Sequence, residues 1–167
     1  MPPEEIEENR KQLESAQGYG EVWRLTKHNV KTVLDKGRGS MMLFLDDMPL
    51  RLGAYHPLGT NNIVLNRALV QIVEATTKST KLLNAFVYVL LLHEYLHALG
   101  YVRETQVRPL VYRVSKTCFG EEYATTQLAK LGPWSLLQGL PLDRLEGPKK
   151  VIEIVKDFEK ANPRYVV

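Results

Sequence analysis

The stretch KLLNAFVYVLLLHEYLHALG, residues 81–100, is apolar on nearly every side when it is drawn as a helix. A helix that is apolar all round is buried in the core of its domain. Ser79 and Thr80 precede the stretch and either is a suitable N-cap, while Gly100 is a suitable C-terminal stop. The sequence therefore predicts a long central helix that runs through Leu99.

The residues around this helix predict a mixed fold. Three short apolar runs before it have the length of strands, at residues 41–45, 51–55 and 63–65. Apolar periodicity predicts further helices at residues 2–16, 22–34, 69–73, 108–118, 121–130 and 147–162. We therefore expect an α+β fold that is mainly helical, with a small, roughly three-stranded sheet preceding the central helix.

Proline positions set the start of two of these helices. Pro109 is tolerated in the first turn of a helix, so that helix should begin near Arg108, after a turn formed by residues 101–107. Gly147 and Pro148 should open the last helix in the same way. The apolar residues expected on its inner face are Val151, Ile154, Val155 and Phe158.

Length and composition predict a single domain, residues 1–167, in which residues 1–18 form a helical appendage with a weak apolar face. The net charge of +3 is spread along the chain, so no nucleic-acid partner is predicted. No apolar run approaches the roughly 20 residues that span a bilayer, so no membrane partner is predicted. One cysteine, Cys118, and the lack of a signal-peptide pattern predict a cytoplasmic protein whose thiol is buried.

The end of the central helix contains the segment HEYLH, residues 93–97. His93 and His97 are four residues apart, which puts both imidazoles on one face of a helix, about one turn apart. Two imidazoles at this spacing can bind one zinc ion. Glu94 lies one residue round the helix, where it can reach a water molecule on the metal without being a ligand itself.

This pattern resembles that of the HExxH zincin metallopeptidases. The resemblance covers residues 93–97 and the helix that carries them. It implies a zincin-like fold, a Zn²⁺ cofactor held by His93 and His97, and a peptide or protein substrate. Glu94 would be the catalytic base that activates the zinc-bound water for attack on the peptide bond.

A catalytic zinc ion has three protein ligands, so one more is needed. In the metzincin pattern a glycine stands three residues after the second histidine, and a third histidine follows three residues later. Gly100 matches, but Arg103 occupies the histidine position and arginine does not bind zinc, so the chain is not a regular metzincin. Glu104 is the preferred third ligand, because it follows the glycine and lies in phase with the apolar stripe further along.

Other residues remain alternatives for the ligand and for substrate binding. Glu121 and Glu122 open the next predicted helix, and this resembles the gluzincins, in which a downstream helix supplies a glutamate. Small single-domain gluzincins also match the chain in size. We expect Asn62–Asn66 to be an edge strand that binds substrate backbone. His28 and His56 are further candidates, either as ligands or as substrate contacts. The candidates for the oxyanion donor, by residue type alone, are His56, Tyr101, Arg103 and Tyr123.

Two other functions remain open on the sequence alone. One is a metallohydrolase that acts on a substrate other than a peptide. Certain RNA-processing metalloproteins also place histidines on a helix, but they lack the motif glutamate, and Glu94 argues against that class. The other is a non-catalytic metal-binding or regulatory domain with a vestigial site, which a closed four-ligand site would favour.

Overall fold

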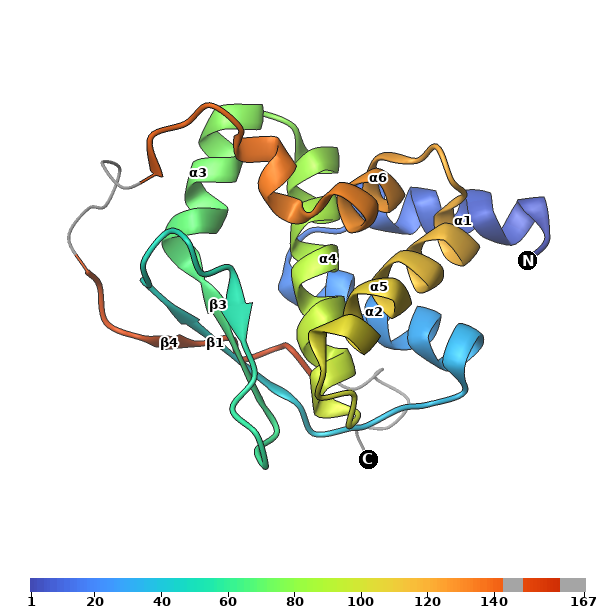
Figure 1. Ribbon diagram of the computed structural model, residues 1–167, viewed down its shortest axis with the longest axis horizontal. Helices are drawn as coiled ribbons and strands as arrows, with labels where there is room; N and C mark the ends of the chain where they lie inside the picture. Colours follow the sequence, from blue (N-terminus) through green and yellow to red (C-terminus); the bar gives the residue numbers. More distant parts are fainter. Residues whose placement is uncertain (143–148, 160–167) are drawn as a thin grey trace.

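The structure, a computed structural model, describes residues 1–142 and 149–159. Its helices and strands follow one another along the chain as shown in Figure 1. They are α1 (Pro3–Ser15), α2 (Tyr19–Leu34), β1 (Met42–Asp46), β2 (Ala54–Tyr55), β3 (Asn62–Asn66), α3 (Arg67–Thr77), α4 (Thr80–Ala98), α5 (Glu104–Phe119), α6 (Ala124–Leu131), the 3₁₀ helix η1 (Pro133–Leu137) and β4 (Glu153–Ile154). The expectation of a mainly helical α+β fold with a small sheet is confirmed.

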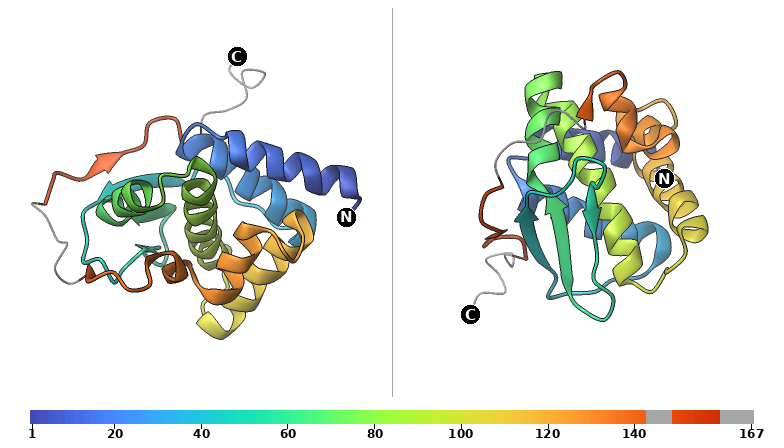
Figure 2. Two further views of the ribbon diagram at one scale, coloured as in Figure 1. Left: turned by 90° about the horizontal axis from the view of Figure 1, so that it is seen from above. Right: turned by 60° about the vertical axis from the view of Figure 1, so that its left-hand side comes forward.

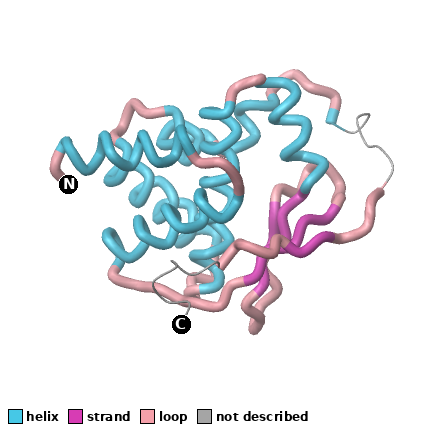
Figure 3. The backbone as a smooth tube through the Cα atoms, turned by 180° about the vertical axis from the view of Figure 1, so that it is seen from behind, coloured by secondary structure: helices cyan, strands magenta, loops and turns pink. Residues whose placement is uncertain are grey.

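The sheet has four strands in the order β2-β3-β1-β4, one more than expected. β1 and β3 pair in parallel, while β2 and β4 are the antiparallel edges. Asn62–Asn66 is therefore an internal strand, and the expectation that it is an edge strand is wrong. The edge position beside α4 belongs to β2, which contacts that helix. Figures 2 and 3 show the sheet and α3 on one side of α4, and the helices α1, α2, α5 and α6 on the opposite side.

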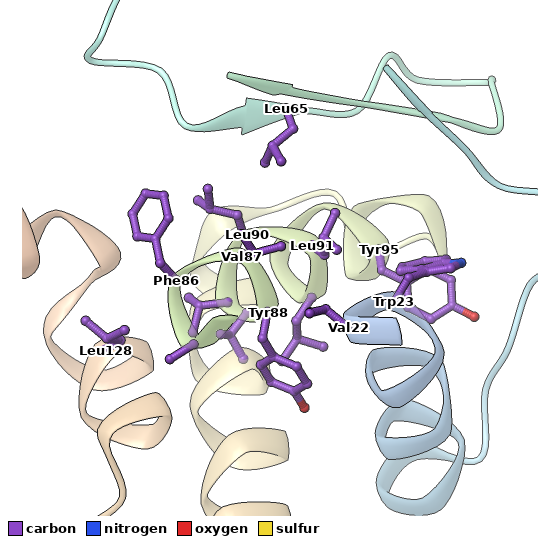
Figure 4. Close-up of a cluster of buried hydrophobic side chains, with 14 of the residues drawn as sticks. Val22, Trp23, Leu65, Phe86, Val87, Tyr88, Leu90, Leu91, Tyr95 and Leu128 are labelled. Carbon is purple, nitrogen blue, oxygen red and sulfur yellow. The ribbon is translucent and has the colours of Figure 1, made fainter. Parts of the chain in front are cut away.

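The predicted central helix is α4, and its N-cap is Ser79, whose hydroxyl accepts a hydrogen bond from the Leu82 amide at 3.2 Å. Its apolar side chains meet the sheet on one side, where Leu65 faces Leu90, and the helices on the other (Figure 4). A helix of this kind is held by burial on all faces rather than by one apolar stripe. The residues of α4 that are wholly shielded from solvent are Phe86, Tyr88, Leu91, Leu92, Tyr95 and Leu96.

The N-terminal helix α1 is part of the helical layer and not an appendage. Leu13 is buried, and α1 packs against α2, α4 and α5. The amide of Asn9 donates a hydrogen bond to the Cys118 carbonyl at 3.1 Å, and that of Asn84 donates to the Leu13 carbonyl at 2.8 Å. The weak apolar face of α1 is thus supplemented by buried polar contacts. Cys118 is a free, buried cysteine, as expected.

The start of α5 differs from the expectation. The helix begins at Glu104, four residues before the expected start, so Pro109 lies inside it. Proline at this position removes a single backbone hydrogen bond, the one to the carbonyl of Thr105. The fold tolerates this loss because Val107 and Val111, on either side of the proline, are buried in the core.

The predicted last helix is not formed in the part of the chain that the structure describes. Its expected start at Gly147 and Pro148 lies outside the described residues. Within residues 149–159, Glu153–Ile154 form β4, which pairs with β1. Of the four apolar residues expected to face inward, Phe158 is buried and Val155 is partly buried, whereas Val151 and Ile154 are exposed. Pairing with the open edge of β1 has overridden the helical periodicity.

Residues 158 and 159 support the central helix through Trp23 of α2. Phe158 stacks on Trp23 with ring centroids 4.6 Å apart, and Trp23 packs edge-on against Tyr95 at 4.7 Å. The Trp23 indole donates a hydrogen bond to Glu159 at 3.0 Å. None of the helices in the described residues combines the length and apolar character needed to cross a bilayer.

Candidate metal centre

The two histidines of the motif face the same side of α4. Their rings lie one turn apart, with centroids separated by 5.0 Å. The chain then turns through Gly100, whose φ of 106° is strained for residues with a side chain. This turn brings Glu104, the first residue of α5, back to the histidines. The ligand atoms of His93, His97 and Glu104 all lie within 4.8 Å of one another.

Glu104 lies between the two imidazoles. One of its carboxylate oxygens is 2.8 Å from His97 Nε2 and 3.1 Å from His93 Nε2. Ligand atoms at about 2.0–2.1 Å from a tetrahedral zinc ion are separated by roughly 3.3 Å from each other. The observed separations are close to this value, so small side-chain movements are enough to place an ion among the three residues.

His97 has a hydrogen bond that fixes its tautomer. Its Nδ1 lies 2.8 Å from the carbonyl oxygen of Tyr101, which can only accept a hydrogen bond. Nδ1 therefore carries a proton, and in the neutral ring Nε2 presents a lone pair. That lone pair faces a carboxylate oxygen of Glu104. Two acceptors this close require a cation between them, either a proton or a metal ion. A carbonyl partner on the second nitrogen is also usual for a metal-binding histidine.

The electrostatics of the cluster suit a metal ion. Burial lowers the pKa of His93, which favours the neutral form that binds metals, and Glu104 acts in the opposite direction without overcoming it. Partial burial acts to raise the pKa of Glu104, but the hydrogen bonds and charges of His93 and His97 outweigh it and leave that pKa lowered. At neutral pH the centre therefore offers a carboxylate and a neutral imidazole.

Glu94 is buried, whereas the side chain of Glu104 is half exposed. Glu94 is 7% exposed, and burial raises the pKa of its carboxyl group to about 7. Within the described residues it has no hydrogen-bond partner, so its oxygens are available to a ligand. A carboxylate with a pKa near neutrality can both accept and release a proton at physiological pH.

A cleft of about 760 Å³ opens beside the cluster. His93, Glu94 and Glu104 line it, and so does the chain leading into β2, residues 51–54. This approach is close because residue 53 is a glycine. A Cβ atom there would come within 2.8 Å of Leu90 Cδ2 on α4. The cleft thus places the three residues next to the exposed edge of the sheet.

The alternative ligands lie elsewhere. Glu121 accepts a hydrogen bond from the Tyr112 hydroxyl at 2.6 Å and pairs with Lys130 at 3.6 Å. It lies in the turn before α6, which begins at Ala124 and not at the expected residue 121. Neither Glu121 nor Glu122 belongs to the three-residue cluster found among the described residues.

The candidate oxyanion donors have mostly other contacts. The hydroxyl of Tyr123 donates to Glu14 of α1, and His56 lies 2.7 Å from the Asn62 carbonyl through Nδ1. Arg103 is the exposed residue before α5, and Tyr101 contributes its backbone carbonyl to the centre. None of these four residues lines the cleft. His28 is exposed on α2 and does not belong to the cluster.

Arg108, Tyr112 and Trp134 are among the residues of the cleft that the sequence did not identify. Arg108 and Tyr112 follow Glu104 by four and eight residues, so they share its face of α5. Their spacing from Glu104 could have identified them once α5 was known to begin at that residue. Comparison with known protein families, characterised proteins and solved structures finds no match to this chain.

Proposed function

We propose that the protein is a zinc-dependent peptidase, in which His93, His97 and Glu104 hold the metal and Glu94 is the general base. The observation that carries the proposal is the contact between His97 Nε2 and Glu104 at 2.8 Å. Because Nδ1 is committed to the Tyr101 carbonyl, this contact needs either a proton or a metal ion between the two atoms, and the nearby His93 supplies the second imidazole that a metal ion would use. Two imidazoles and a carboxylate form a donor set that zinc accepts in hydrolases.

The number of ligands supports a catalytic site over a structural one. The cluster among the described residues has three ligating side chains, whereas a structural zinc site is closed by four. Bound zinc supplies a Lewis acid, which polarises the substrate carbonyl and lowers the pKa of water. Glu94, one residue from His93 and in the same cleft, accepts the proton of the attacking water and passes it to the leaving amine.

The sheet edge supports a peptide as the substrate. Residues 51–54 line the cleft, and β2 is paired with β3 on one side only. An extended peptide can add to such an edge through backbone hydrogen bonds. Those bonds would hold the scissile carbonyl in the cleft, between the metal ligands and Glu94.

The proposal is tested with purified, zinc-loaded protein and a mixture of unstructured peptides, in which new termini are detected by mass spectrometry. We expect cleavage that a chelator abolishes and added zinc restores. His93→Ala should abolish both zinc binding and cleavage. His28→Ala is the matched control, because His28 is exposed on α2 and should leave both unchanged. Zinc binding without any cleavage would overturn the peptidase assignment, and failure to bind zinc would overturn the metal centre as well.

A further inference from the structure

The cleft is lined by charged side chains of both signs. Its lining contains the basic residues Arg51, Arg108 and Lys130 and the acidic residues Glu94 and Glu104. Glu104 is committed to the histidines, and Lys130 is paired with Glu121 at 3.6 Å. Arg108 is therefore the candidate for binding a negatively charged ligand, because it lies in the cleft beside the metal centre.

Arg108 is a basic residue in direct contact with the candidate metal centre. It lies one turn after Glu104 on α5, and its Nε is 3.5 Å from Glu104 Oε2. Its side chain is 78% exposed, so its guanidinium group is accessible from the cleft. The contact with Glu104 is made through Nε, so the other donors of the guanidinium group remain for a ligand. A guanidinium group then offers two parallel donors, which match a carboxylate.

The distance between Glu104 and Arg108 along α5 limits how far the carboxylate can lie from the metal centre. One turn of α-helix rises about 5.4 Å. An extended peptide advances about 3.3 Å per residue. Arg108 therefore reaches a carboxylate within about two residues of the bond that lies over the metal centre.

The wall of the cleft next to the basic residues is apolar. Leu131 is an exposed apolar residue at the end of α6, and Pro133 and Trp134 continue the same wall into η1. Val111 of α5 is buried beneath it. A large apolar side chain would cover this surface and gain the free energy of removing it from water.

From these features we infer that the cleft selects peptides that carry a carboxylate within about two residues of the scissile bond, next to a large apolar residue, and that Arg108 binds the carboxylate. The position relative to a scissile bond rests on the proposed function; the carboxylate site itself does not. The carboxylate can be that of an acidic side chain or of the peptide C-terminus.

Trp134 provides a direct measure of binding. The chain has two tryptophans, and Trp23 is fully buried whereas Trp134 lines the cleft. A peptide that binds the cleft should therefore change the fluorescence of Trp134, and Trp134→Phe should remove the change. The titration uses the Glu94→Gln protein, which avoids turnover, with and without zinc. The four peptides share one apolar core and carry an acidic side chain with an amidated end, a neutral side chain with a free carboxylate, neither group, or a lysine.

We expect at least one carboxylate peptide to bind roughly ten-fold more tightly than the neutral amidated peptide, and the better of the two identifies the source. Arg108→Gln should remove this preference. Arg113→Gln, an exposed arginine of the same helix outside the cleft, should retain it. Equal binding of all four peptides, or a preference that survives Arg108→Gln, would overturn the inference. A preference that persists in protein unable to hold zinc would keep the carboxylate site while the peptidase proposal fails.

Discussion

Glu94 and Glu104 line the same cleft, but their surroundings shift the pKa values of the two carboxyl groups in opposite directions. Glu94 lies on buried α4, where burial raises its pKa to about 7. Glu104 lies at the more open start of α5, where the two histidines outweigh the effect of burial and lower its pKa. The comparison shows that ten residues of chain are enough to build one carboxyl group suited to proton transfer and one suited to metal binding.

The largest expected effect comes from Glu94→Gln, which tests the role of the buried carboxyl. Glutamine keeps the shape but cannot accept a proton, so peptide cleavage should fall by about 10³-fold. Zinc content should stay the same, because Glu94 is not in the ligand cluster. Cleavage rate and zinc content are measured on the same sample, with the exposed Glu122→Gln as control. Full activity in the Gln variant would refute the assigned role.

Glu104→Ala tests the exposed carboxyl in the same way. Removal of one of three ligands should weaken zinc binding by at least about 100-fold, more than the loss of an outer-shell partner. Affinity is measured by competition with a chromophoric chelator. Glu121→Ala is the control, because this glutamate is held by Tyr112 and Lys130 away from the cluster. If Glu121→Ala released zinc and Glu104→Ala did not, Glu121 would replace Glu104 as the third zinc ligand.

The raised pKa of Glu94 predicts a stability that depends on pH in the metal-free protein. In the unfolded chain this carboxyl loses its proton near its usual pKa of 4.5, and in the folded protein near 7. Stability should therefore fall as pH rises from about 4.5 to 7 and stay low above that range. Glu94→Gln removes this loss, so its free energy of unfolding relative to the wild type should rise by about 2–3 kcal/mol between pH 4.5 and 8.5.

Urea unfolding of both metal-free proteins at the two pH values gives this difference. The comparison of the two chains cancels the effects of the other titrating groups, because all of these are shared. A difference that does not change with pH would mean that Glu94 is not desolvated in the folded protein.

The smallest expected effect concerns the turn that joins the two carboxyl groups. Gly100 has a φ of 106°, and an added Cβ atom would meet no other atom within 4 Å. Gly100→Ala should thus cost about 1 kcal/mol through backbone strain alone. Gly39→Ala is the control, because Gly39 is equally open and its φ is not positive. Unfolding free energies that match in the two variants would contradict the strain at Gly100.

Local signals in the sequence were sufficient for the central helix and for its motif. Ser79, the apolar residues of α4 and the spacing of His93 and His97 all act within a few turns of one helix. Glu104 was named because it follows Gly100, and the structure brings it to the histidines. Its role as a ligand stays a prediction.

The missed features depend on contacts between distant residues. The edge position of β2 and the internal position of Asn62–Asn66 follow from which strands pair, and β1 pairs with residues about 20 and 110 positions away. β4 replaced a predicted helix because the edge of β1 was open. The start of α5 was predicted too late because Pro109 was taken to lie in its first turn. In the structure the burial of Val107 and Val111 outweighs the loss of the hydrogen bond that a proline removes.

The stack of Tyr95, Trp23 and Phe158 has a consequence for the order in which the molecule matures. Tyr95 belongs to the HEYLH segment. Trp23 packs against it and donates a hydrogen bond to Glu159, which lies 136 positions later in the chain. Contacts across so much sequence form late, because a long loop must close before they are gained. A growing chain on the ribosome therefore presents the histidine helix long before it can complete the support behind it. The support behind the candidate metal centre thus depends on a residue that is synthesised well after the two histidines.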